Sequence, residues 1–216
     1  MATLIPLLVI VFAVLAAVPM LRHHDPERRA QGLRRSGFGW LATFGGLGGL
    51  FVAGETFADP GGWAAVGLVL AWVVPLALLS VLAWRRPALA QPVLLALVVV
   101  VVAYCAWSVL GPQAYRDFRN QRGPIDAIAV LVVSVALGVL GVRRARPAGL
   151  MLLATSLLPM ALMALGSGAP FSQAFSGSLG AASVPGLVSA ALFLLAAHEA
   201  QSHAASTPHG LVTPRG

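Results

Sequence analysis

The charged residues of this chain are confined to short stretches between seven long apolar segments. An apolar run of about 17 to 25 residues can cross the hydrocarbon core of a bilayer as a single α-helix. Charged residues make up 10% of the chain and apolar residues 58%, whereas a soluble domain carries about 25% charged residues. The sequence therefore predicts an all-α, polytopic membrane protein, a bundle of about seven transmembrane helices.

The predicted bundle occupies residues 1–199 and leaves a polar tail at 200–216, which we expect to be flexible and cytosolic. No separate soluble domain is expected. The first apolar segment has no basic residue before it, so it does not resemble a secretory signal peptide. The predicted spans cover residues 4–21, 37–55, 61–83, 88–111, 126–142, 148–165 and 181–197.

Arginine is concentrated in every second gap between these segments. One side of the predicted bundle receives Arg22, Arg28, Arg29, Arg34, Arg35, Arg85, Arg86, Arg143, Arg144, Arg146 and Arg215, with the acids Asp25, Glu27 and Glu199. The other side receives Arg116, Arg119 and Arg122, with Glu55, Asp59, Asp117 and Asp126. Loops rich in arginine stay in the cytosol. This asymmetry predicts an N-terminus outside and a cytosolic C-terminus.

The net charge of +7 does not indicate nucleic-acid binding, because the basic residues follow the rule for cytosolic loops. All fourteen are Arg and none is Lys. Together with abundant Ala, Val, Leu and Gly, this composition is typical of a GC-rich bacterial genome. We expect a multi-pass protein of the bacterial cytoplasmic (inner) membrane, with the lipid bilayer as its first partner.

Several kinds of membrane chemistry are excluded by residue type and position. Without Lys, no retinal Schiff base can form. The histidines, which haem ligation or an intramembrane protease would need within a span, lie at or beyond the predicted cytosolic boundary. They are His23, His24, His198, His203 and His209. We therefore expect no enzyme activity, catalytic residue, cofactor or metal.

One composite metal site is the alternative at the cytosolic boundary. His198 and His203 are five residues apart, about 140° around a helix, which does not fit the four-residue spacing of a zinc-protease helix. A site would have to combine them with His23, His24 and Asp25 from the start of the chain. Solvated boundary residues are the simpler interpretation.

Few residues within the predicted spans are candidates for a function. Glu55, at the outer end of the second span, is the ionisable group nearest to a membrane interior. Its simplest interpretation is a carboxylate at the level of the headgroups. Gly45 and Gly49 form a pair of small residues that allows another helix to approach closely. Pro75 and Pro159 lie inside the third and sixth spans and are expected to kink them.

Two short helices are predicted outside the spans. Asp25, Pro26 and Glu27 form a helix-start sequence, with a capping Asp and a Pro suited to the first turn, so a cytosolic helix should begin there. In the loop after the fourth span, Tyr115, Phe118, Arg119 and Arg122 have helical spacing. They predict an interfacial helix with its aromatics towards the membrane; a docking surface for a partner is the alternative.

Residues 81–87 and 139–144 have similar sequences, each leading from a span into a turn rich in arginine. Duplicated hairpins occur in transporters, but any two Ala/Leu/Val hairpins with cytosolic arginines look alike. The layout of residues 39–95, especially the stretch 51–57 and the motif at 83–87, resembles small uncharacterised prokaryotic multi-pass membrane proteins. The resemblance covers about a quarter of the chain and implies no activity.

The sequence thus favours a non-enzymatic structural or accessory partner, associated with another membrane protein or with itself. A small permease for an uncharged or weakly polar solute is the alternative. A lipid-modifying enzyme comes third, because no acids and histidines cluster within the spans. A tightly filled bundle would favour the accessory role, and a continuous polar stripe would favour transport.

Overall fold

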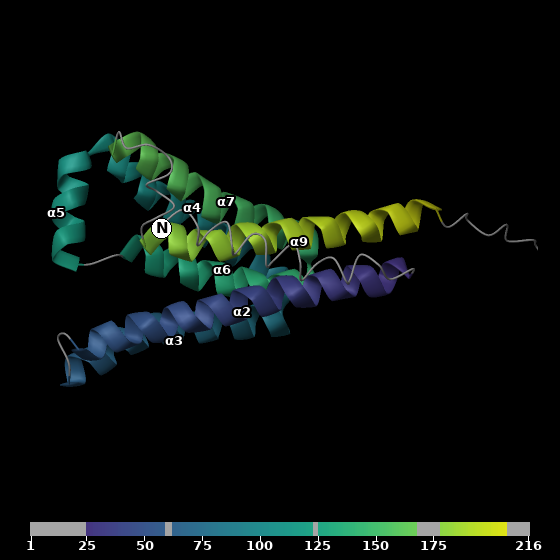
Figure 1. The fold of residues 1–216 in the computed structure, drawn as a ribbon, viewed down its shortest axis with the longest axis horizontal. Coiled ribbons are helices and arrows are strands. Elements are labelled where there is room, and N and C mark those ends of the chain that lie inside the picture. The colour runs from purple at the N-terminus through teal and green to yellow at the C-terminus, as the bar shows by residue number, and fades with distance from the viewer. Residues whose placement is uncertain (1–24, 59–61, 123–124, 168–177, 207–216) are drawn as a thin grey trace, which may run out of the picture.

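The chain is all-helical wherever its structure, a computed structural model, describes it: residues 25–58, 62–122, 125–167 and 178–206 (Figure 1). The described helices are α2 (Pro26–Ala58), α3 (Gly62–Arg85), α4 (Pro87–Leu110), α5 (Pro112–Arg122), α6 (Ile125–Arg143), α7 (Ala145–Ser167) and α9 (Ser178–Ser206). Five of them, α3, α4, α6, α7 and α9, are long and apolar enough to cross a membrane. They indicate a multi-pass membrane protein, and the all-α prediction is confirmed.

The last five predicted spans match these five helices in order, and most of the helix ends agree to within a few residues. The predicted span at 37–55 forms part of α2. The predicted span at 4–21 lies outside the described residues, as do 207–216 of the predicted tail. The total of seven spans and the orientation of the termini stay predictions.

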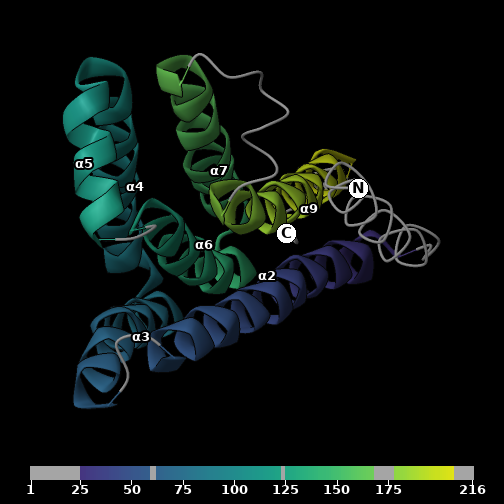
Figure 2. The ribbon, with the colours of Figure 1, turned by 60° about the vertical axis from the view of Figure 1, so that its left-hand side comes forward.

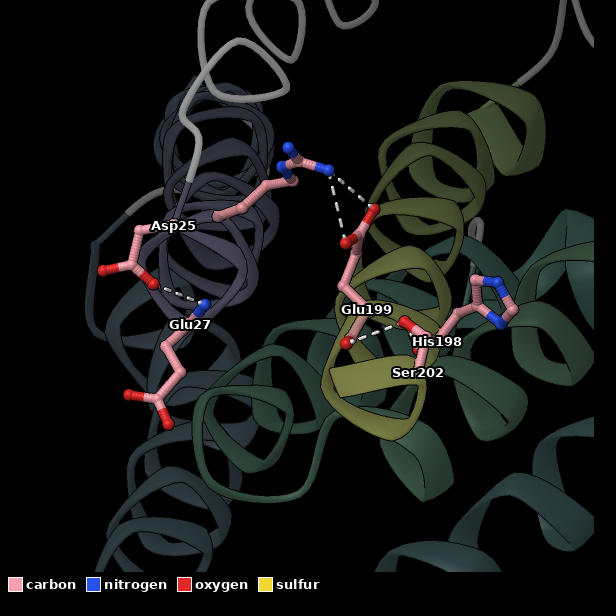
Figure 3. Close-up of polar contacts among 6 residues, drawn as sticks. Asp25, Glu27, His198, Glu199 and Ser202 are labelled. Carbon is pink, nitrogen blue, oxygen red and sulfur yellow. Dashed lines mark hydrogen bonds and ion pairs between the residues drawn. The ribbon is translucent and has the colours of Figure 1, made fainter. Parts of the chain in front are cut away.

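Helix α2 begins where the sequence predicts a helix start. The Oδ1 atom of Asp25 accepts a hydrogen bond of 3.0 Å from the backbone N–H of Glu27 (Figure 3), and Pro26 occupies the first turn. The predicted cytosolic helix does not stop before the predicted span at 37–55. No proline interrupts residues 27–58, so the two form one helix of 33 residues, about 50 Å long.

Helix α9 is also longer than a membrane crossing requires. It has 29 residues, which corresponds to about 44 Å, whereas the hydrocarbon core is about 30 Å thick. It continues through residues 200–206, which the sequence assigned to the flexible tail. The hydroxyl of Ser202 donates to the carbonyl oxygens of His198 and Glu199 within this extension.

The helices run back and forth between two ends of the bundle (Figure 1). One end, called the arginine end, contains the start of α2, the end of α9 and the α3–α4 and α6–α7 turns. There α2 and α9 reach beyond the two turns. At the opposite end, called the α5 end, the short helix α5 lies across the bundle. This helix corresponds to the predicted interfacial helix.

The two turns of the arginine end have the same backbone hydrogen bonds. The N–H of Arg86 donates to the carbonyl of Leu82 at 2.8 Å, and that of Arg144 to the carbonyl of Leu140 at 2.7 Å. The carbonyl of Arg86 accepts a hydrogen bond of 2.9 Å from the N–H of Ala90. The carbonyl of Arg144 accepts one of 3.2 Å from the N–H of Ala148. The similar stretches 81–87 and 139–144 thus form two tight turns of one geometry.

The centre of the bundle is formed by α6 and α9, and α3 is peripheral. Helix α6 contacts α2, α3, α4, α7 and α9 (Figure 2). In the most apolar stretch of α9, 67% of the residues are buried inside the protein, against 6% in α3. Because α3 nonetheless consists almost wholly of apolar residues, its exposed side chains are suited to lipid rather than to water.

Glycines allow the central helices to approach closely. The ring of Phe193, on α9, is fully buried. It lies against Gly37 of α2, where a Cβ atom would be 3.3 Å from Cε1 of the ring, and against Gly141 of α6, where a Cβ atom would overlap the ring. At Gly138 a Cβ atom would lie 2.8 Å from Cδ1 of Leu41. A larger residue at Gly141 would displace the buried ring of Phe193, whereas one at Gly138 would displace the end of the Leu41 side chain.

We predict opposite outcomes for two adjacent glycines of α2. A Cβ atom on Gly45 would lie 2.6 Å from Cγ2 of Val135 on α6, whereas one on Gly46 would meet nothing within 4 Å. Gly45→Leu should lower the free energy of unfolding in detergent by about 1–3 kcal/mol through overpacking. Gly46→Leu is the matched control and should leave it unchanged or slightly higher, because Leu favours helix more than Gly does.

Thermal unfolding of the two purified variants measures this difference. Equal melting temperatures for Gly45→Leu and Gly46→Leu would contradict the close approach of α2 and α6.

Candidate functional site

The residues that the sequence singled out do not come together in one place. Gly45 is buried against Val135, between α2 and α6. Gly49 and Glu55 also belong to α2, but their surroundings lie outside the described part of the chain. Pro75 is exposed on α3, so it faces the lipid side of the bundle. Pro159 is fully buried within α7.

The most unusual buried group is Asp126, in the first turn of α6. Its exposed fraction is 0%. The sequence predicts Asp126 on the outer side, as the first residue of the span at 126–142, and α6 does begin there. Its complete burial is what the sequence did not predict. The first turn of a helix favours a carboxylate, because the backbone N–H groups there carry partial positive charge.

Aromatic side chains from two helices cover the same end of the bundle. Tyr104 and Trp107 of α4 face Tyr115 and Phe118 of α5, with ring centroids between 5.7 and 6.3 Å apart. The sequence predicts that Tyr115 and Phe118 face the membrane, and this part of the prediction is wrong, because both rings pack against α4. Aromatic pairs at these distances stabilise such a contact beyond the area that they bury.

Cys105, which follows Tyr104 on α4, has a buried thiol. Asp126 is near enough to this thiol to interact with it electrostatically, and the hydroxyl of the neighbouring Ser108 donates to the carbonyl of Cys105 at 2.6 Å. We call Tyr104, Cys105, Ser108, Tyr115 and Asp126 the α5-end cluster. A closed cluster of this kind can hold α4, α5 and α6 together, but neither its thiol nor its carboxylate reaches the surface.

A second set of polar groups, which we call the hydroxyl seam, lies deeper, between α6, α7 and α9. Ser134, Ser156 and Ser183 are buried, and within the described residues their hydroxyls have no hydrogen-bond partner. The Oγ atom of Ser156 touches the position that a Cβ atom on Gly186 would take, and the Oγ atom of Ser134 lies 3.5 Å from it. Gly186 thus lets the hydroxyls of two helices approach α9.

At the arginine end, an ion pair connects the two long helices. The Nη1 atom of Arg29, on α2, lies 3.3 Å from Oε1 of Glu199, on α9 (Figure 3). Both side chains are about one quarter exposed, so solvent weakens the pair less than a fully exposed one. No local sequence signal predicts this contact, because it joins residues 170 positions apart.

The composite metal site finds no support in the described residues. Figure 3 shows Glu199 turned towards α2 and His198 turned away from Asp25. Within the described ranges, no group of three or more His, Cys, Asp and Glu residues could hold a metal ion. His23 and His24 precede these ranges, and the side chain of His203 is not among those described.

Comparison with known proteins adds no further constraint. No family model matches the chain, and no curated protein or solved structure is significantly similar to it. The resemblance to small prokaryotic multi-pass proteins therefore stays a prediction.

We predict that Asp126 and Glu55 respond differently when each is replaced by the matching amide. Asp126→Asn changes a fully buried carboxyl group at the start of α6 and should lower the free energy of unfolding by about 1 kcal/mol. Glu55→Gln should leave membrane insertion and stability largely unchanged. Thermal unfolding in detergent at neutral pH measures both.

Unfolding of Asp126→Asn at the wild-type temperature, together with a lower unfolding temperature for Glu55→Gln, would contradict this prediction. Glu55 would then become the candidate for function.

Proposed function

We propose that the chain is a non-enzymatic structural or accessory protein of the bacterial cytoplasmic membrane. The observation that carries this proposal is the filling of the bundle centre. At Gly45, Gly138 and Gly141, side chains of neighbouring helices already occupy the space of the missing Cβ atom. A centre filled in this way favours a fixed scaffold over a protein that opens for a solute.

The orientation with the C-terminus in the cytosol is part of this proposal. It is supported by the arrangement of the arginines, since the two basic turns and the start of α2 lie at one end of the bundle. Loops with this bias remain in the cytosol. The absence of Lys from the chain and its Ala/Val/Leu/Gly-rich composition support a bacterial origin.

The positions of the reactive groups argue against an enzyme. A nucleophile or a general base must reach its substrate. Cys105 and Asp126, which lie near each other, are both buried. His198, by contrast, is exposed on α9. Among the described residues, therefore, no set of groups suited to acid–base catalysis lies together where a substrate can reach it.

An accessory protein needs a surface for its partner, and the peripheral helices offer one. Large apolar side chains are exposed along α3 and α4, among them Leu70, Leu78, Val99 and Leu110. Lipid covers such a face in isolation, and the helix of another membrane protein, or of a second copy, fits the same chemistry.

The alternative is a small permease for an uncharged or weakly polar solute. It is favoured by the hydroxyl seam, where Ser134, Ser156 and Ser183 are buried between three helices. Unbonded hydroxyls inside a bundle can serve a passing solute as well as they serve helix packing.

Liposomes that contain the purified protein distinguish the two functions. We expect glycerol and urea to enter them no faster than they enter protein-free liposomes, as measured by stopped-flow light scattering. A protein-dependent increase of about tenfold, abolished by Ser156→Leu, would contradict the proposal and establish the permease.

Crosslinking in intact cells tests the accessory role itself. A photo-reactive residue in place of the exposed Leu70 should form a defined adduct with a membrane protein or with a second copy. The same residue in place of the buried Leu137 is the matched control and should form none. Adducts with lipid alone at Leu70 and at further exposed positions of α3 and α4 would argue against a partner on this face.

A further inference from the structure

The turns α3–α4 and α6–α7 bring five arginines to one part of the arginine end. They are Arg85, Arg86, Arg143, Arg144 and Arg146, and all of them are exposed. Contacts between the two hairpins hold this group together. The guanidinium of Arg143 lies over the ring of Trp84 on α3, 4.7 Å from the ring centroid. Arg144 donates through Nη1 to Oε1 of Gln91 on α4 at 2.8 Å.

Among the described residues, no carboxylate pairs with any of these five arginines. The acids described at this end are Asp25, just before α2, Glu27 on α2 and Glu199 on α9. Asp25 pairs with Arg28 and Glu199 with Arg29. The rule for cytosolic loops explains why arginines are present here, but not why two turns are joined into one patch without an acid.

Exposed apolar side chains lie directly beside these arginines. Val81 and Trp84 precede Arg85 on α3, Leu89 follows Arg86 on α4, and Leu150 follows Arg146 on α7. Trp84 is 53% exposed, although the guanidinium of Arg143 lies over its ring. Tryptophan and arginine next to an apolar span are typical of the level at which lipid headgroups lie.

We propose that the five turn arginines form a binding site for the headgroup of an anionic phospholipid. Guanidinium groups bind phosphate oxygens through charge-assisted, often paired hydrogen bonds. Arg143 and Arg144 position the site, since their contacts with Trp84 and Gln91 fix the two turns relative to each other. Arg85, Arg86 and Arg146 face the headgroup, and the acyl chains lie along the exposed apolar side chains of α3 and α4.

The test compares two double variants that lose the same charge. Arg86→Gln with Arg146→Gln removes two arginines of the site and leaves the contacts of Arg143 with Trp84 and of Arg144 with Gln91 in place. Arg28→Gln with Arg35→Gln removes two exposed arginines of α2 and is the matched control. The full chain is purified in a mild, uncharged detergent, and the binding of phosphatidylglycerol and of phosphatidylcholine is measured by native mass spectrometry.

We expect the wild type to prefer phosphatidylglycerol, the turn variant to lose about tenfold of this preference, and the control to lose less than about twofold. Equal losses in the two variants would overturn the site, because they would show a general attraction by net charge. No loss in either variant would overturn it as well.

A second measurement does not depend on the folding of a variant. The preference of the wild type for phosphatidylglycerol should fall severalfold when sodium chloride is raised from about 0.05 M to about 0.5 M, because salt screens the exposed guanidinium groups. A preference that does not change with salt would contradict binding through the arginines.

Discussion

The contact of Phe193 with two glycines is the constraint on which the rest of the bundle depends. One aromatic ring on α9 fills the space beside Gly37 on α2 and Gly141 on α6, so three helices meet at one buried side chain. Within a membrane, no hydrophobic effect drives helices together, and close packing has to supply the association energy. The flat surface of a glycine next to a large ring provides such packing.

Around this contact, the polar groups of the bundle fall into three levels. The hydroxyl seam lies between α6, α7 and α9, the α5-end cluster closes one end, and the arginines occupy the other. At the arginine end, the two long helices α2 and α9 continue beyond the turns and are joined by Arg29 and Glu199. An ion pair at this place ties the two extensions together.

Much of this fold could be predicted from hydropathy and from local signals. The apolar runs predict α3, α4, α6, α7 and α9, because each is long enough to cross a bilayer and is bounded by charge, by proline or by a loop of small residues. The start of α2 follows from Asp25 and Pro26, and α5 follows from the spacing of Tyr115 and Phe118. Each of these signals acts within one or two helical turns, so the sequence alone displays it.

What the sequence did not reveal depends on contacts between distant segments. Asp126 stands at the start of a predicted span, directly after a polar stretch, and only the packing of α4 and α6 shows that it is buried. The merging of the predicted cytosolic helix with the predicted span at 37–55 depends on the absence of any break between them. Of the candidate residues, Gly45 could be named from its small size, but its neighbour Val135 could not.

The most direct test of this close packing is the coupling between Gly141 and Phe193. Gly141→Ala places a methyl group where the ring of Phe193 lies, and should lower the free energy of unfolding in detergent by about 1–3 kcal/mol. In the double variant with Phe193→Leu, the smaller side chain should make room for the methyl group. The free energy lost in the double variant should therefore be smaller than the sum of the two single losses by about 1 kcal/mol or more. Losses that simply add would contradict the close packing of α6 against α9.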